Sequence, residues 1–244
     1  MDKGSAVRDM FERIARRYDA ANTVMTGGID ALWRRQAVAA LALPSGARVL
    51  DLCCGTGALT CELARLAPDG QVIGVDFAAT MLEVARRRRS GPNITYERAD
   101  VLRLPYADAS FDAAAMAFSM RNVTDIGACL REIARVLKPG GRFVNLEVGK
   151  PDNPVLRRAF YAYFYGLIPL VGGLVGGDRA AYRYLPQSLI NFPDARGLAA
   201  LFTSSGFARV SCRPLAGGVA YLHLGTSESS RAASLSPQYA ASGA

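Results

Sequence analysis

Histidine and cysteine are scarce in this chain, which limits the chemistry open to it. His223 is the only histidine, and none of the five cysteines belongs to a C-x-x-C pair. A histidine in an apolar strand, with no carboxylates and thiols clustered beside it, is more often a core or edge residue than a ligand, so we expect no metal site. The odd number of cysteines argues against a disulfide framework and favours a reducing compartment.

The chain also lacks a signal segment and is short of acids. Its N-terminus has no apolar core of the signal-peptide type, so we expect a cytoplasmic protein. The net charge of +8 fits either an anionic membrane surface or a nucleic acid. Residues 86–89, four arginines, end a predicted helix, where cations complement the helix dipole on a solvated face. Because no aromatic residues are interleaved with them for stacking on bases, we expect no nucleic-acid partner.

Apolar runs alternate with helical patterns through the middle of the chain. Such alternation is typical of an α/β protein with a doubly wound, mostly parallel sheet. Two later apolar runs joined at Gly217 and Gly218 predict a hairpin that completes a seven-stranded sheet. We expect one domain over residues 1–225 and a disordered tail over 226–244. The strands are predicted near residues 47–52, 71–76, 93–98, 112–118, 141–147, 208–214 and 219–224.

Residues 49–57, VLDLCCGTG, form an apolar strand that runs into a glycine-rich turn. Gly55 and Gly57 have no side chain, so the backbone N–H groups of the turn can approach a ligand closely. Asp76, at the end of the next strand, is placed to accept hydrogen bonds from ribose hydroxyls. The dinucleotide fingerprint needs a third glycine where this chain has Thr60, so the turn suits a nucleoside without phosphates. The alternative is a tight strand-to-helix turn without a ligand.

This turn resembles the first motif of the class I S-adenosylmethionine-dependent methyltransferases, and further motifs follow in the order of that family. An aromatic residue follows Asp76, and Asp100 comes after the third predicted strand, where an acid meets the adenine amino group in that fold. Each motif alone is ordinary turn chemistry, and Asp76 or Thr80 could cap a helix instead. The resemblance implies a Rossmann-like fold that binds S-adenosylmethionine through Asp51, Gly55, Thr56, Gly57, Asp76, Phe77, Asp100 and Val101, with Asp51 near the amino group of the cofactor.

Three segments outside the shared fold resemble the ubiquinone/menaquinone biosynthesis C-methyltransferase family. They are residues 11–34, with FERIARRYD and Trp33; residues 121–125, RNVTD; and residues 177–188, with YRYL and Ser188. The likeness covers roughly residues 7–225. It implies methylation of a ring carbon of a polyprenylated, lipid-soluble quinol, with S-adenosylmethionine as methyl donor and no metal.

Some residues depart from the family pattern. Asp30 stands where the family usually has histidine, and Ala117 stands where it can have serine. These departures leave the cofactor scheme intact and leave open which quinone is methylated. The alternatives are a class I methyltransferase for a soluble small aromatic or specialised metabolite, an RNA methyltransferase, and a catalytically silent cofactor-binding protein.

Within the resemblance, Arg121 is the candidate catalytic residue because it follows the fourth strand at the mouth of the predicted cleft. Its charge would stabilise a phenolate, or hold a water that takes the ring proton. Otherwise it is a surface arginine paired with Asp125. Asn122 would orient a substrate oxygen unless it only forms a turn.

Aromatic residues are expected to complete the site. Tyr182, Arg183 and Tyr184 would form the wall opposite Arg121 and bind the quinol, with buried structural tyrosines as the alternative. Tyr18 would cover the cofactor.

Two helical additions are expected around the sheet: a cap over residues 1–42 and a lid over residues 152–192, before the last two strands. Residues 159–177 of the lid are almost wholly apolar, although Pro169 and paired glycines interrupt them. We favour an apolar lid or membrane-contacting surface over a buried helix pair or a membrane span. We therefore expect a peripheral protein that contacts the inner face of the membrane transiently. The oligomeric state stays open, a homo-oligomer included.

Overall fold

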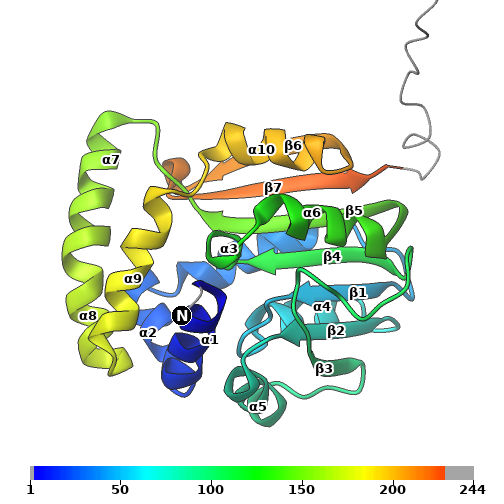
Figure 1. Cartoon of the computed structure of the whole chain (residues 1–244), viewed down its shortest axis with the longest axis horizontal. Coiled ribbons are helices and arrows are strands. Elements are labelled where there is room, and N and C mark those ends of the chain that lie inside the picture. The colour runs from blue at the N-terminus through cyan, green and yellow to red at the C-terminus, as the bar shows by residue number, and fades with distance from the viewer. Residues whose placement is uncertain (1–2, 229–244) are drawn as a thin grey trace, which may run out of the picture.

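The computed structural model describes residues 3–228, and a seven-stranded sheet runs through it (Figure 1). The strand order is β3-β2-β1-β4-β5-β7-β6, and only β7 runs antiparallel to its neighbours. The predicted α/β class, the mostly parallel sheet and the terminal hairpin are confirmed. The strands are β1 (Arg48–Leu52), β2 (Gln71–Asp76), β3 (Ile94–Arg98), β4 (Phe111–Ala117), β5 (Leu137–Val148), β6 (Phe207–Leu215) and β7 (Ala220–Ser227).

Helices cover both faces of the sheet, so its central strands are apolar on both sides. Nearly every residue of β1 and β4 is buried or half-buried, as expected for parallel strands between two helix layers. One layer contains α3 (Ile29–Ala40) and α4 (Ala58–Leu66). Helix α5 (Ala79–Arg88) packs Leu82 and Ala85 against Tyr96 of β3. The other layer contains α6 (Ile126–Val136) and α10 (Ala195–Ser204). Within it, Phe202 of α10 stacks on Phe143 of β5.

The last two strands form a hairpin through the short 3₁₀ turn η3 (Ala216–Gly218). Gly217 and Gly218 both have positive φ, +68° and +93°, which glycine adopts readily. The prediction that the ordered chain ends at residue 225 is wrong, because β7 continues to Ser227. Thr226 pairs with Arg142 of β5. The pairing with β5 and β6 holds this end of β7 in the sheet, although its small polar residues show no apolar pattern in the sequence. Residues 229–244 of the predicted tail lie outside the described residues.

Three helices precede the sheet: α1 (Lys3–Ile14), α2 (Tyr18–Thr26) and α3. Glu12 of α1 accepts hydrogen bonds from the backbone N–H groups of Ala79 (2.7 Å) and Thr80 (2.8 Å), at the start of α5. The N-cap residue of α5, Ala78, has no side chain able to cap it. A carboxylate from another helix therefore satisfies these N–H groups and fixes α1 over the carboxyl ends of the strands.

The segment between β5 and β6 adds a helical layer at the edge of the molecule. Here α7 (Pro154–Tyr161), the π-helical turn η2 (Ala162–Leu167) and α8 (Ile168–Gly176) form one long helix, and α9 (Arg179–Ile190) folds back on it (Figure 1). Tyr182 of α9 lies against Gly172 and Gly176, where an added Cβ would overlap its ring. The long helix is the only one within residues 3–228 that is long and apolar enough to cross a membrane, and 28% of its apolar stretch is buried.

Candidate active site

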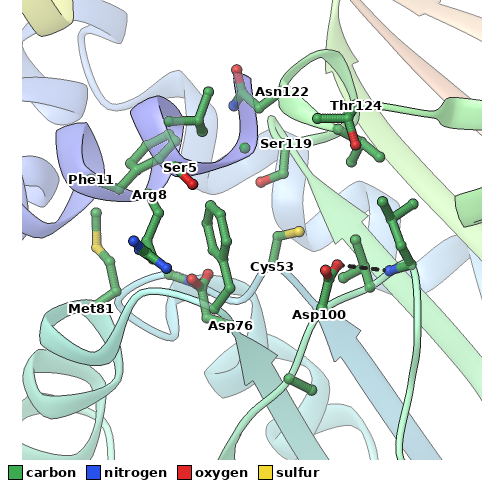
Figure 2. A pocket seen from close by; sticks show the side chains of 18 of the residues that line it. Ser5, Arg8, Phe11, Cys53, Asp76, Met81, Asp100, Ser119, Asn122 and Thr124 are labelled. Carbon is green, nitrogen blue, oxygen red and sulfur yellow. Dashed lines mark hydrogen bonds between the residues drawn. The ribbon is translucent and has the colours of Figure 1, made fainter. Parts of the chain in front are cut away.

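A cavity of about 270 Å³, the first cavity, lies at the carboxyl ends of the parallel strands (Figure 2). The residues that follow β1, β2, β3 and β4 line one side, and α1 covers the other. The chain order of the strands reverses between β1 and β4, and open α/β sheets bind ligands in the crevice at such a point. The topology therefore places a ligand site here before any side chain is considered.

Asp76 organises the glycine-rich turn on the wall of the first cavity. Its carboxylate accepts hydrogen bonds from the backbone N–H groups of Gly55 (2.8 Å) and Ala78 (2.9 Å), and so joins the turns after β1 and β2. Gly55 has a φ of +55°, and an added Cβ there would meet no atom within 4 Å, so bare backbone faces the open cavity. Burial raises the pKa of Asp76 to about 6, which leaves most molecules ionised at neutral pH.

Three more of the predicted cofactor residues line the same cavity. Phe77 follows Asp76, and Asp100 and Val101 follow β3. The Asp100 carboxylate accepts a hydrogen bond from the N–H of Leu102 at 2.9 Å (Figure 2). Because Asp100 is exposed, its carboxylate remains open to a donor from a ligand.

The other predicted residues of the turn do not line the cavity. Asp51 is buried beneath it and accepts a hydrogen bond from the Thr60 hydroxyl at 2.6 Å, so the residue in place of the third glycine holds this carboxylate. Burial raises the pKa of Asp51 to about 7. The Thr56 hydroxyl donates to Asp19 of α2 at 2.6 Å. Gly57 has a φ of +84° and leaves room for the ring of Tyr96. Asp51, Thr56 and Gly57 therefore support the conformation of the turn without lining the cavity.

Helix α1 contributes a wall that the motifs did not predict. Val7, Arg8 and Phe11 line the first cavity together with Ser5, and Figure 2 shows the Arg8 side chain near Asp76. The spacing of these residues places them on one face of a helix. The sequence predicted a helical cap that includes these residues, but it did not show which face of the helix would meet the glycine-rich turn.

Asn122 lies on the first cavity, with Ser119 and Thr124 beside it. It was expected to bind substrate, and the structure places it in the lining of the cavity that holds the predicted cofactor residues (Figure 2). Its Oδ1 is buried without a hydrogen-bond partner among the described residues. Buried acceptors are nearly always paired, so this atom is suited to a donor from a ligand.

A second cavity, of about 460 Å³, adjoins the first. Its walls come from α2, α3 and the long helix of the lid, and most of them are apolar, including Phe160, Phe164 and Ile168. Val24 and Tyr163 also line it and are partly exposed, so the cavity reaches the surface between α2 and the lid. Tyr18 lines both cavities and forms part of the wall between them.

Arg121 lies at a polar end of the second cavity. Its guanidinium forms a buried ion pair with Glu147 of β5, donates from Nη1 to the carbonyl of Phe118 at 2.6 Å, and donates from Nε to the Ser188 hydroxyl at 3.2 Å. Nη2 has no partner within residues 3–228. The alternative of a surface arginine paired with Asp125 is wrong, because Asp125 caps α6 by accepting from the N–H of Ala128.

Asp30 and Arg34 form a second ion pair on the lining of this cavity. The Thr26 hydroxyl also donates to Asp30, at 2.8 Å. Burial acts to raise the pKa of Asp30, but the hydrogen bond and charge of Arg34 outweigh it and hold the pKa below its usual range. The residue that departs from the family pattern is therefore a carboxylate at neutral pH, held at the second cavity.

The three residues predicted as the opposite wall line neither cavity. Burial raises the pKa of Tyr182 to about 12, and its hydroxyl, like that of Tyr184, has no partner within the described residues. Tyr184 packs against the main core. Arg183 is exposed and borders a groove on the outer side of α8 and α9. The wall is formed instead by Phe160 and Phe164 of the long helix.

Within residues 3–228, no group of three or more histidine, cysteine or acidic side chains is placed to hold a metal ion. His223 is buried, and its Nε2 lies 2.8 Å from the carbonyl oxygen of Ala195. Burial lowers the pKa of His223, which keeps its ring neutral. This geometry is that of a core histidine.

Proteins of known fold share this architecture. The cyclase SpnF aligns with a TM-score of 0.69 at 19% identity, covering 94% of this chain and 98% of that one. An S-adenosylmethionine-dependent methyltransferase from Thermotoga maritima aligns with a TM-score of 0.65 at 22% identity, covering 90% and 99%. These likenesses show a class I methyltransferase fold.

Sequence comparison gives a closer relationship. The ubiE/COQ5 methyltransferase family model matches residues 1–227. Demethylmenaquinone methyltransferase of Deinococcus radiodurans is 43% identical over 226 residues, which cover 92% of this chain and 93% of that protein. Ubiquinone/menaquinone biosynthesis C-methyltransferase UbiE of Pseudomonas aeruginosa PAO1 is 41% identical over 229 residues, which cover 91% and 89%. The match runs through both cavities, and this chain belongs to the ubiE/COQ5 family of S-adenosylmethionine-dependent methyltransferases.

Proposed function

We propose that this enzyme transfers a methyl group from S-adenosylmethionine to a ring carbon of a polyprenylated quinol, demethylmenaquinol or a close relative. The observation that carries the proposal is the junction of the two cavities. The 3₁₀ turn η1 (Met120–Asn122) directs Asn122 to the first cavity and Arg121 to the second. A methyl donor in one cavity and an aromatic acceptor in the other would meet beside this turn and Tyr18.

The residues of the first cavity fit S-adenosylmethionine. Asp76 offers carboxylate oxygens to ribose hydroxyls, and Phe77 offers an apolar face to the adenine. The exposed carboxylate of Asp100 can accept from the adenine amino group, and the unpartnered Oδ1 of Asn122 can accept from the ammonium group. The bound cofactor supplies the methyl group, activated on a sulfonium.

Arg121 prepares the acceptor in this mechanism. A ring carbon next to a hydroxyl becomes nucleophilic as the hydroxyl loses its proton, and a buried cation favours the resulting phenolate. Glu147, the Phe118 carbonyl and Ser188 fix the guanidinium before substrate binds, and Nη2, which has no partner within residues 3–228, remains for this contact. A water held by Arg121 can take the ring proton after methyl transfer. Nearby, Asp30 can accept a hydrogen bond from the second hydroxyl of the quinol.

The apolar part of the second cavity suits the prenyl chain. Aromatic and aliphatic side chains line it, and it opens beside the long helix, whose outer face is apolar. A polyprenylated quinol resides in the bilayer, so we further propose that the enzyme works in the cytoplasm and contacts the membrane peripherally. No nucleic-acid partner is needed for this reaction.

Methylation in a defined mixture tests the proposal. The purified protein, S-adenosylmethionine carrying a labelled methyl group, and a chemically reduced demethylmenaquinol with a short side chain should yield a C-methylated product by mass spectrometry. Label on oxygen, or no transfer to any quinol while a soluble catechol or a transfer RNA is methylated, would overturn the assignment. A cofactor-site variant, Asp76→Ala, should give less product when S-adenosylmethionine is limiting.

A further inference from the structure

The outer face of the lid presents apolar side chains to solvent. Leu167, Leu170 and Leu174 are 48%, 55% and 77% exposed, and they lie on one long helix. Figure 1 shows that this helix forms the edge of the molecule, on the side away from β3. Exposed leucines in such a row are unusual for a protein surface that meets only water.

Two arginines lie directly beside this apolar row. Arg179 and Arg183 are on α9, four residues apart and both exposed, and they border a groove of about 250 Å³ with Gly166, Pro169 and Leu170 of the long helix. The Arg179 stem crosses Gly173, where an added Cβ would lie 2.6 Å from its Cγ. The absence of a side chain at residue 173 therefore lets the arginine lie along the apolar helix.

Neither arginine has an acidic partner within residues 3–228. The nearest acid along the helix, Asp178, caps α9 and forms an ion pair with Arg13 of α1 at 2.8 Å. Its carboxylate therefore already has partners. Like charges four residues apart on a helix repel each other, and a shared anion removes that repulsion. The groove thus offers two guanidinium groups to an anion from outside the chain.

We propose that this groove binds the phosphate of an anionic phospholipid while Leu170 and Leu174 enter the acyl boundary of the same leaflet. Guanidinium groups bind phosphate through paired N–H donors, and an apolar helix face flanked by cations is typical of interfacial helices. The protein has a net charge of +8, which adds attraction toward an anionic bilayer.

This orientation would set the opening of the second cavity at the bilayer. Tyr163 lines that cavity and belongs to the same long helix, four residues before Leu167. A lipid-soluble quinol could then pass from the leaflet to the cavity without crossing water. Passage of the quinol rests on the proposed function, whereas phosphate binding is argued from the two arginines and the apolar row alone.

Vesicle sedimentation tests the site. The protein should bind vesicles of phosphatidylcholine mixed with phosphatidylglycerol far more tightly than vesicles of phosphatidylcholine alone. Arg179→Gln/Arg183→Gln should weaken binding to the anionic vesicles roughly 30-fold, since each arginine near the surface contributes about fivefold. Arg179→Lys/Arg183→Lys keeps the charge but not the paired donors, so it should bind with intermediate affinity.

A matched control removes the same charge elsewhere. Arg131→Gln/Arg196→Gln lies on α6 and α10, outside the lid. It should change vesicle binding by less than about twofold because screening limits the reach of surface charges. An equal loss in this control, or parental binding by Arg179→Gln/Arg183→Gln, would overturn the site. Leu170→Gln/Leu174→Gln should weaken binding too. If it instead converts a stable dimer to monomers in analytical ultracentrifugation, the face binds a second copy and the proposal is wrong.

A soluble substrate separates this inference from the proposed function. With a short-chain demethylmenaquinol in the absence of vesicles, Arg179→Gln should retain the parental rate. If the parent methylates no quinol, while Arg179→Gln/Arg183→Gln binds anionic vesicles more weakly than the parent, the proposed function fails and the lipid site stands. If methylation occurs and the arginine variants bind vesicles normally, the function stands and the site fails.

Discussion

Replacing Arg121 should damage stability and catalysis together, and a second change at Glu147 separates the two effects. Arg121→Ala leaves the Glu147 carboxylate, whose residue is 1% exposed, without its charged partner. Breaking a buried ion pair from one side costs about 3–5 kcal/mol. A protein of this size shifts by about 2–4 °C per kcal/mol, so the thermal midpoint should fall by roughly 6–20 °C.

The double variant Arg121→Met/Glu147→Leu removes both charges and keeps most of the volume. Buried ion pairs replaced by apolar side chains often lose little stability, so the thermal midpoint should largely recover. Turnover should not recover, because the cation at the second cavity is still missing. Both variants should turn over about 10²–10³ times more slowly than the parent, as for the loss of one preorganised charge stabiliser.

Three measurements on each variant complete this experiment: thermal unfolding by circular dichroism, calorimetric titration with S-adenosylmethionine, and single-turnover methylation of a demethylmenaquinol analogue. Cofactor affinity should stay near the parental value in the double variant. Arg65→Ala removes an exposed partner of Glu62 and should change neither stability nor turnover appreciably. Restored turnover in the double variant would refute the catalytic assignment, and an unchanged midpoint in Arg121→Ala would refute the burial argument.

Three further predictions concern the turn and the lid. Asp76→Ala should weaken S-adenosylmethionine binding by about 1–3 kcal/mol in a calorimetric titration, and unchanged affinity would remove Asp76 from the site. Burial raises the pKa of Asp51 to about 7 from 3.8, so the ligand-free protein should lose stability as the pH rises through that window. The free energy of unfolding, measured by urea titration at several pH values, should lose about 4 kcal/mol of this pH dependence in Asp51→Asn. An unaltered slope of that free energy against pH would contradict the raised pKa. Gly176→Ala should overpack the ring of Tyr182 and cost about 1–3 kcal/mol, whereas Gly166→Ala, with open space at its Cβ, should not.

The sheet and the turn could be predicted because local patterns encode them. Each parallel strand is an apolar run bounded by turn residues, and the turn after β1 has glycines, Gly55 and Gly57, at positive φ. The chain order of strands and helices then fixes which strand ends meet. Gly55, Asp76 and Asp100 were located in this way, and the structure brings all three to one cavity.

Partners that lie far apart in the sequence could not be predicted. Arg121 pairs with Glu147, 26 residues later, because β4 and β5 are neighbours and their ends lie together. The sequence offered Asp125 because it is near in the chain. The register of the strands, which depends on the whole packed core, decided between them. The same limit applies to Glu12, whose carboxylate caps a helix 67 residues away.

Motif membership also did not distinguish residues that contact a ligand from those that support the site. Tyr182 belongs to a specific family segment, yet its ring lies against Gly172 and Gly176 and holds α9 on α8. A tyrosine that packs two helices together and one that contacts a substrate look alike in a sequence. The glycines on the facing helix are the distinguishing signal, since they leave the space that the ring fills.

The two cavities divide the reaction between the sheet and the added helices. Strand ends shape one side of the first cavity, and α1 covers the other. Helices α2 and α3 and the lid shape most of the second cavity. On the proposed function, we expect residues such as Asp30 and Phe164 to determine the choice of acceptor, and Asp76 and its turn to determine the use of the cofactor. Tyr18 lies on both walls, so changing it should alter the apparent affinity for both substrates.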